Sequence, residues 1–108
     1  MEYILATLKS VESRGQTLIL HFDSPEKPEI DFVASLSMKN HPYPSKELRD
    51  FAKAINGGSL ILVGGIIWKG TESEIFAFFS DRIGKFCEIQ VTQFFAEYWT
   101  ITNVRAVK

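Results

Sequence analysis

The stretch from Glu47 to Gly65 limits the fold of this 108-residue chain more than any other segment. It opens with a short amphipathic pattern, stops at Gly57-Gly58, continues as an apolar run and ends at a second glycine pair, Gly64-Gly65. This succession places a helix between strands in a chain otherwise patterned for strands. That order of elements favours a small barrel or a sandwich.

The first part of this stretch predicts a helix over residues 45–56. Ser45 can accept a hydrogen bond from a first-turn amide and so cap the helix. Apolar residues then recur along one helical face, at Leu48, Phe51, Ala52 and Ile55. The sequence Asn56-Gly57-Gly58 ends the helix, because glycine readily adopts the left-handed conformation found at helix termini. We expect residues 45–56 to close one mouth of a curled sheet.

The rest of the chain alternates as strands do. Residues 30–38 give the clearest period of two, with one face formed by Ile30, Phe32, Ala34, Leu36 and Met38. Further strands are predicted at 3–11, 16–22, 59–69, 74–79, 86–95 and 98–106, separated by turns rich in glycine, proline or polar residues. About seven strands and one helix predict a mainly β domain that spans residues 1–108.

Composition narrows the classes of function. A formal net charge of −1 argues against a strongly electropositive nucleic-acid binder, although a local basic patch can exist on such a chain. Cys87 is the single cysteine, and its alternation with Ile89 and Val91 predicts a buried thiol. Since we find neither a signal-peptide pattern nor an apolar run of about 20 residues, we expect a cytoplasmic protein with no membrane span.

Few groups could carry catalysis or bind a metal. His21 and Asp23 lie on one strand face, but two ligands do not complete a metal site, and His41 has no evident third partner. Glu72 and Glu74 could pair as acid and base, yet they flank a predicted turn. The chain contains no Ser-His-Asp elbow and no Walker-type phosphate loop. We therefore expect a non-enzymatic protein without metal or cofactor.

Two segments resemble those of a known fold. The glycine-flanked strand Gly57–Gly65, which follows the helix, is similar to the junction before the fourth strand in bacterial single-stranded-DNA-binding proteins. The segment Tyr98–Val104 resembles the last strand of many OB-fold domains. The resemblance implies a small OB-like antiparallel barrel with one α-helix between strands 3 and 4. Residues 70–95 exceed the bare barrel and would contain an added β-hairpin.

The same resemblance implies a site for single-stranded nucleic acid, with single-stranded DNA the first candidate. OB barrels bind on the outer face of strands 2 and 3 and on the flanking loops, where cations hold phosphates and aromatic rings stack bases. Here the candidates on and around that face are His21, Lys39, Tyr43, Trp68, Lys69, Arg82, Lys85 and Arg105. Basic residues are sparser than this family usually carries.

A protein-interaction or oligomer-assembly domain is the alternative. Two aromatic clusters support it, namely Phe76, Phe78 and Phe79, and then Phe94, Phe95, Tyr98 and Trp99. A strand of consecutive aromatics has apolar groups on both faces, so one face would need cover from a second copy or another protein. A barrel that encloses a small ligand is a third possibility, ranked last because so short a chain leaves little interior space.

Overall fold

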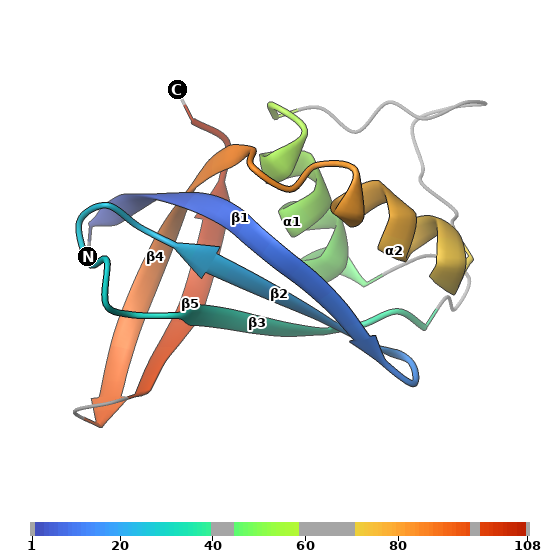
Figure 1. The fold of residues 1–108 in the computed structure, drawn as a ribbon, viewed down its shortest axis with the longest axis horizontal. Coiled ribbons are helices and arrows are strands. Elements are labelled where there is room, and N and C mark those ends of the chain that lie inside the picture. Colours follow the sequence, from blue (N-terminus) through green and yellow to red (C-terminus); the bar gives the residue numbers. More distant parts are fainter. Residues whose placement is uncertain (1, 40–44, 59–70, 96–97, 108) are drawn as a thin grey trace.

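Five strands close into a barrel in the order β1-β2-β3-β5-β4 (Figure 1). The structure is a computed structural model that describes residues 2–39, 45–58, 71–95 and 98–107. Within these residues the elements are β1 (Tyr3–Arg14), β2 (Thr17–Asp23), β3 (Phe32–Ser37), α1 (Lys46–Ile55), α2 (Glu72–Ser80), β4 (Phe86–Phe95) and β5 (Tyr98–Arg105). The prediction of a mainly β barrel is confirmed, and the barrel is compatible with an OB-like fold.

The pairing of the strands explains how the sheet closes. β1 is antiparallel to β2 over its second half and to β4 over its first half. A register shift between Leu8 and Ser10 marks the place where β1 bends from one partner to the other. β2 pairs with β3 and β4 with β5, both antiparallel. The ring is completed by a short parallel contact between β3 and β5 at Val33 and Thr100.

Alternation along β2 and β3 divides the barrel into an apolar interior and a polar exterior. The inward side chains of both strands are buried, and they are Leu18, Leu20, Phe22, Phe32, Ala34 and Leu36. The residues between them are half-buried or exposed. This confirms which face of each strand points outward, as the period of two predicts.

Helix α1 forms where the sequence predicts it and covers one end of the barrel. The backbone N–H of Leu48 donates to Ser45 Oγ at 3.2 Å, which is the expected N-cap. The rings of Phe51 and Phe22 lie 6.0 Å apart, so the helix packs directly on the β2 side of the core. Gly57 and Gly58 both have positive φ, and the Gly58 N–H donates to the Lys53 carbonyl at 2.8 Å to close the helix.

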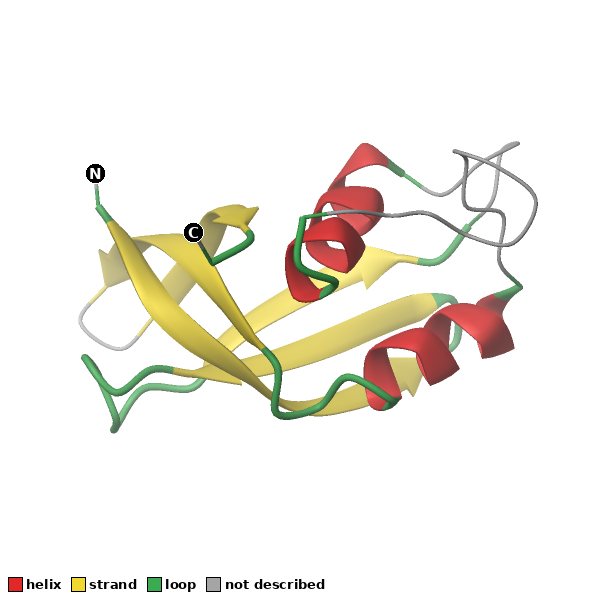
Figure 2. Cartoon of the chain, turned by 90° about the horizontal axis from the view of Figure 1, so that it is seen from above, coloured by secondary structure: helices red, strands yellow, loops and turns green. Residues whose placement is uncertain are grey.

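The prediction of a strand at 74–79, within an added hairpin, is wrong. Residues 72–80 form α2, which Figure 2 shows beside α1 at the end of the barrel away from the N-terminus. Thr71 Oγ1 accepts from the Glu74 N–H and donates to the Glu74 carboxylate, so Thr71 is the N-cap of α2. Ile75, Phe78 and Phe79 are buried at a helical spacing of three and four.

The other elements differ little from their predicted bounds. β1 continues to Arg14, so the turn into β2 lies at Gly15 rather than at residues 12–15. The predicted strand at 59–69, with its glycine pair, lies outside the described residues. Cys87 is fully buried, as expected, and burial raises the pKa of its thiol to about 12, with a smaller effect from Glu88. Neither described helix is long and apolar enough to cross a membrane.

Candidate nucleic-acid interface

The outer surface of β2 and β3 presents small and uncharged side chains around one histidine. We call it the β2–β3 face, and it comprises Thr17, Ile19, His21, Val33, Ser35 and Ser37. The register pairs Ile19 with Ser35 and His21 with Val33, so these side chains are direct neighbours. Val33 is 38 % exposed and both serines are exposed, which shows that no described element covers this face.

His21 lies between two carboxylates from different parts of the chain. Its Nε2 is 2.9 Å from Glu12 Oε1 on β1, and its Nδ1 is 3.0 Å from Asp31 Oδ2 in the segment before β3. We call Glu12, His21 and Asp31 the His21 clamp. Two cations border it: Lys9 Nζ is 3.1 Å from Asp31 Oδ1, and Arg14 Nη2 is 3.6 Å from Glu12 Oε2.

The clamp shifts the titration of all three members. The hydrogen bond with Glu12, supported by Asp31, raises the pKa of His21 although partial burial opposes the rise. The hydrogen bond to His21 holds the pKa of Glu12 below its usual value. Burial acts to raise the pKa of Asp31, but hydrogen bonds with His21 and Lys9 outweigh it, so this pKa is lowered. All three shifts favour the charged forms.

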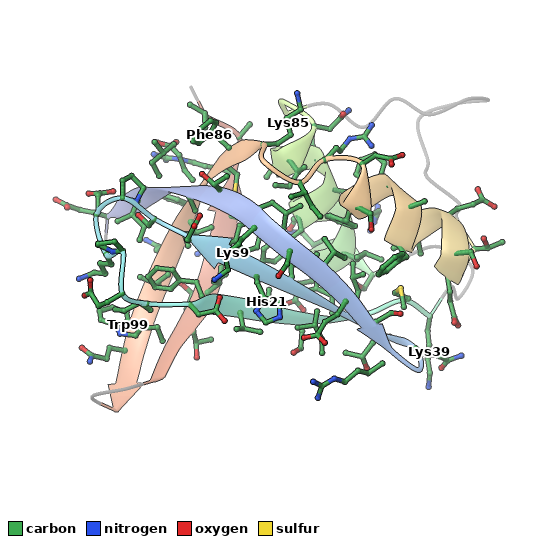
Figure 3. All side chains as sticks on the ribbon, in the orientation of Figure 1. Lys9, His21, Lys39, Lys85, Phe86 and Trp99 are labelled. Carbon is green, nitrogen blue, oxygen red and sulfur yellow. The ribbon has the colours of Figure 1, made fainter. Side chains whose placement is uncertain are left out.

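Positively charged side chains lie at both ends of the β2–β3 face. Lys39 is exposed just after β3, and at the opposite end Lys27 Nζ lies 4.8 Å from the centre of the Trp99 ring. In the view of Figure 3 the label of His21 lies between those of Trp99 and Lys39, and Trp99 is partly buried against the core. The Trp99 ring also meets Phe32 edge to face, with ring centres 6.1 Å apart.

Trp99 and Lys27 were not among the sequence candidates. Trp99 is the second residue of β5, close to the β4–β5 connection, and OB barrels use that connection in binding. The sequence analysis placed Trp99 only in an aromatic cluster and did not relate it to this connection. Lys27 belongs to the proline-flanked segment Ser24–Pro28, whose pattern gives no sign that it returns to β5.

Arg82 holds the two helices together rather than facing His21. Its Nη1 donates to the Phe78 carbonyl at 2.9 Å, its Nε donates to Asn56 Oδ1 at 3.2 Å, and its guanidinium lies 3.7 Å from the centre of the Phe78 ring. The Nη1 and Nε hydrogens of Arg82 thus bond to groups of the protein itself. Arg82 therefore links the last turn of α2 to the end of α1.

The remaining sequence candidates also lie away from the β2–β3 face or outside the described residues. Arg105 donates from Nε to Glu88 Oε1 at 2.9 Å and stacks on Tyr3 at 3.7 Å. Lys85 is exposed beside Phe86, in a part of Figure 3 well separated from His21. Tyr43, Trp68 and Lys69 are outside the described ranges. Of the candidates whose positions are described, only His21 and Lys39 share the predicted face.

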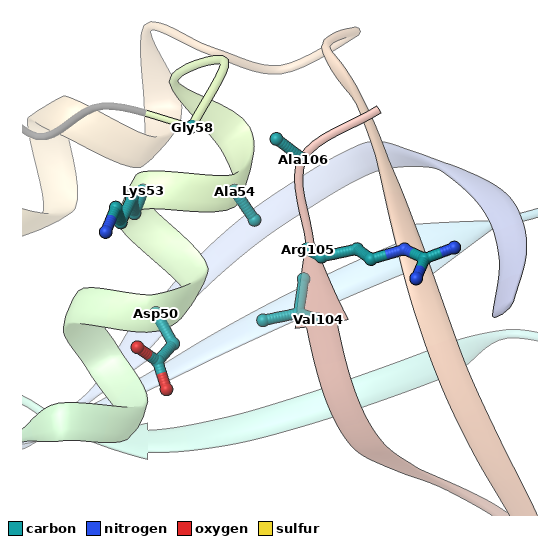
Figure 4. A pocket seen from close by; sticks show the side chains of 7 residues that line it. All are labelled: Asp50, Lys53, Ala54, Gly58, Val104, Arg105 and Ala106. Atoms are coloured by element: carbon teal, nitrogen blue, oxygen red, sulfur yellow. The ribbon is translucent and has the colours of Figure 1, made fainter. Parts of the chain in front are cut away.

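Among the hollows lined by described residues, two larger than 200 Å³ lie away from the β2–β3 face, beside α1. A cavity of about 220 Å³ separates α1 from the end of β5 (Figure 4), and its acidic member Asp50 already pairs with Lys46 at 2.8 Å. The side chain of Arg105 points away from this cavity. A groove of about 360 Å³ is lined in part by Lys85, Phe86 and Val107. Phe86 is 56 % exposed, so this groove presents an aromatic side chain beside the polar residues Asn56, Arg82 and Lys85.

The described residues bring together no metal-binding group of three or more His, Cys, Asp or Glu side chains. Both ring nitrogens of His21, which the sequence suggested as a metal ligand with Asp23, are instead hydrogen-bonded to Glu12 and Asp31. Comparison with known proteins found no matching family model and no similar curated protein. The interpretation of the site therefore depends on its geometry.

Proposed function

We propose that this protein is a non-enzymatic binding module that holds single-stranded nucleic acid, with single-stranded DNA the first candidate, on its β2–β3 face. One observation carries the proposal. The closed β1-β2-β3-β5-β4 barrel leaves this face uncovered in the described residues, with a lysine near each end and a tryptophan beside one of them. This is the surface that OB barrels use for oligonucleotides.

The cationic, aromatic and small side chains of this site would contact different parts of the nucleic acid. Lys39 and Arg14 at one end and Lys27 at the other would contact phosphates. Trp99 would stack a base once Lys27 turns from the ring toward a phosphate, since a lysine is held on a ring face by only about 0.5–1 kcal/mol at an exposed site. The short side chains Thr17, Ser35 and Ser37 would let the strand approach the sheet closely.

The expected binding is weak and dependent on salt. Each phosphate contact on a single strand contributes about −0.7 to the slope of log K against log salt, so three cations give a slope of about −2. Glu12 and Asp31 offset Lys9 and Arg14 on the same surface, which further limits the electrostatic attraction. A strong binder would need more uncompensated cations than this face provides.

Fluorescence anisotropy of a labelled oligothymidine, titrated with protein at low and moderate salt, tests the proposal. We expect the wild type to bind at low salt and the double variant Lys27→Glu, Lys39→Glu to bind at least tenfold more weakly. Lys53→Glu is the matched control, because Lys53 is an exposed lysine on α1 and lies away from the β2–β3 face. No binding by the wild type at low salt, or equal loss in the control, would contradict the proposal.

A second candidate function is oligomer assembly, in which a second copy of this chain docks at the Phe86 groove. Three large apolar side chains are exposed near it: Ile83 at 49 %, Phe86 at 56 % and Val107 at 47 %. Phe78 and Phe79 do not contribute to this surface, because both are buried in α2. Light scattering on the wild type and on Phe86→Asp would test it, with a larger species expected only for the wild type.

A further inference from the structure

We propose that the His21 clamp makes nucleic-acid binding on the β2–β3 face proton-linked, so that the ligand binds more tightly when His21 is an imidazolium. This inference rests on the proposed function and adds its regulation. It depends on where the clamp lies: His21 is part of the face, at the end nearer the β2–β3 connection, and is directly across from the exposed Val33.

The hydrogen-bond geometry itself favours the charged ring. An imidazolium has an N–H on both nitrogens, whereas a neutral imidazole has an N–H on one and a lone pair on the other. Both nitrogens of His21 face carboxylate oxygens at 2.9 and 3.0 Å. Loss of the proton would therefore set a lone pair against a carboxylate oxygen and remove one of the two bonds.

The charged groups around His21 carry a net charge that depends on whether His21 is protonated. β1 contributes Lys9, Glu12 and Arg14, the segment before β3 contributes Asp31, and β2 itself contributes Asp23 two residues along. The neighbouring β3 residues on this face are uncharged. Two cations thus meet three carboxylates, which leaves one excess negative charge when His21 is neutral. The imidazolium cancels that excess, and a phosphate is no longer repelled.

The size of the effect follows from Coulomb's law. One unit charge about 8 Å from a phosphate, at a dielectric between those of a protein surface and water, changes affinity by about fivefold. Because only His21 titrates in this scheme, the logarithm of the binding constant changes by at most one unit per pH unit. Because the pKa of His21 is raised from its usual 6.5, the change lies on the alkaline side of that value.

Anisotropy titrations of labelled oligothymidine from about pH 5.5 to 9, at fixed ionic strength, test the inference. We expect wild-type affinity to fall about fivefold across this range. The chain has only two histidines, so His41→Gln is the matched control and should keep the wild-type dependence. His21→Gln should bind with an affinity that changes little with pH. Circular dichroism of His21→Gln checks that the variant folds.

A second measurement uses a variant that retains the imidazole ring of His21. Glu12→Gln removes one carboxylate, so the midpoint of the His21 proton resonances in NMR should move to lower pH in the free protein. In the wild type, oligothymidine should move that midpoint to higher pH, because linkage is reciprocal. No oligothymidine binding at any pH overturns the proposed function and this inference together. Binding with no pH dependence, or with a dependence that survives in His21→Gln, overturns the inference alone.

Discussion

At the scale of single residues, the His21 clamp is a group of three charges that shift one another's pKa values. It joins β1, β2 and the segment before β3 through one side chain. Alternation along β2 was enough to predict that His21 points outward. Its partners could not be predicted, because Glu12 and Asp31 are 9 and 10 residues away and reach His21 only through the strand pairing.

The clamp predicts how stability depends on pH. The raised pKa of His21 means that its contribution to the free energy of unfolding is complete below its usual 6.5 and is lost as pH rises through the raised value. The lowered pKa values of Glu12 and Asp31 mean that their contributions are present above 4.5 and 3.8 and are lost as pH falls through the lowered values.

Urea unfolding should therefore show the clamp's largest contribution between about pH 4.5 and 6.5. The midpoint for wild type should fall between about pH 6 and 9 by more than that of His21→Gln. His41→Gln serves as the control here as well. Parallel curves for wild type and His21→Gln over this range would show that the clamp does not contribute to stability.

Arg82 supports a second prediction for a single residue. Replacement by alanine removes two hydrogen bonds and the stacking on Phe78, and we expect a loss of about 1–2 kcal/mol in the free energy of unfolding. Arg82→Lys should recover only part, since an ammonium cannot reproduce the planar fork. Lys85→Ala, at an exposed neighbouring lysine, should be within about 0.5 kcal/mol of wild type. Equal losses in Arg82→Ala and Lys85→Ala would argue against this linking role.

At the scale of elements, α1 and α2 show which sequence signals were sufficient. In α1 the cap, the apolar stripe and the glycine stop all indicate one helix, and the helix forms. In α2 the run Glu74–Phe79 is nearly all apolar, so it lacks the contrast between faces that separates a helix from a strand. The decisive signal was the N-cap residue Thr71 followed three residues later by Glu74, together with the spacing of Ile75, Phe78 and Phe79.

Removing that cap tests α2 directly. Thr71→Ala should lower the free energy of unfolding by about 1 kcal/mol, because the Glu74 N–H loses its partner. Ser73→Ala is the matched control, since Ser73 is exposed in the first turn and is not the cap. Chemical denaturation of both variants measures the difference. Equal stability of the two would be inconsistent with a helix that starts at Thr71.

At the scale of the whole molecule, one contiguous core ties the barrel to both helices. The apolar faces of β2 and β3, the stripe of α1 and the buried residues of α2 all belong to it. The strand closure was implied only by the resemblance to OB domains, because a period of two defines the inner face of a strand but not its neighbour. The parallel contact between β3 and β5 joins segments far apart in the sequence.

Neighbouring residues on β2 test the division between the inside and the outside of the barrel. Leu20 is fully buried, so Leu20→Ala should lower the free energy of unfolding by about 2–5 kcal/mol. Ile19→Ala, one residue earlier and half-buried on the outer face, should have a clearly smaller effect. Urea unfolding gives both values. A larger loss for Ile19→Ala than for Leu20→Ala would mean that Ile19, and not Leu20, faces the core.

The measurement that bears most directly on the proposed function is NMR mapping of oligothymidine binding with ¹⁵N-labelled protein at low salt. We predict that chemical shifts change along the β2–β3 face, at Ile19, His21, Val33 and Ser35, and at the indole N–H of Trp99. Phe86 and Val107 should remain unaffected. Shift changes confined to the Phe86 groove, or none at saturating oligonucleotide, would contradict the account.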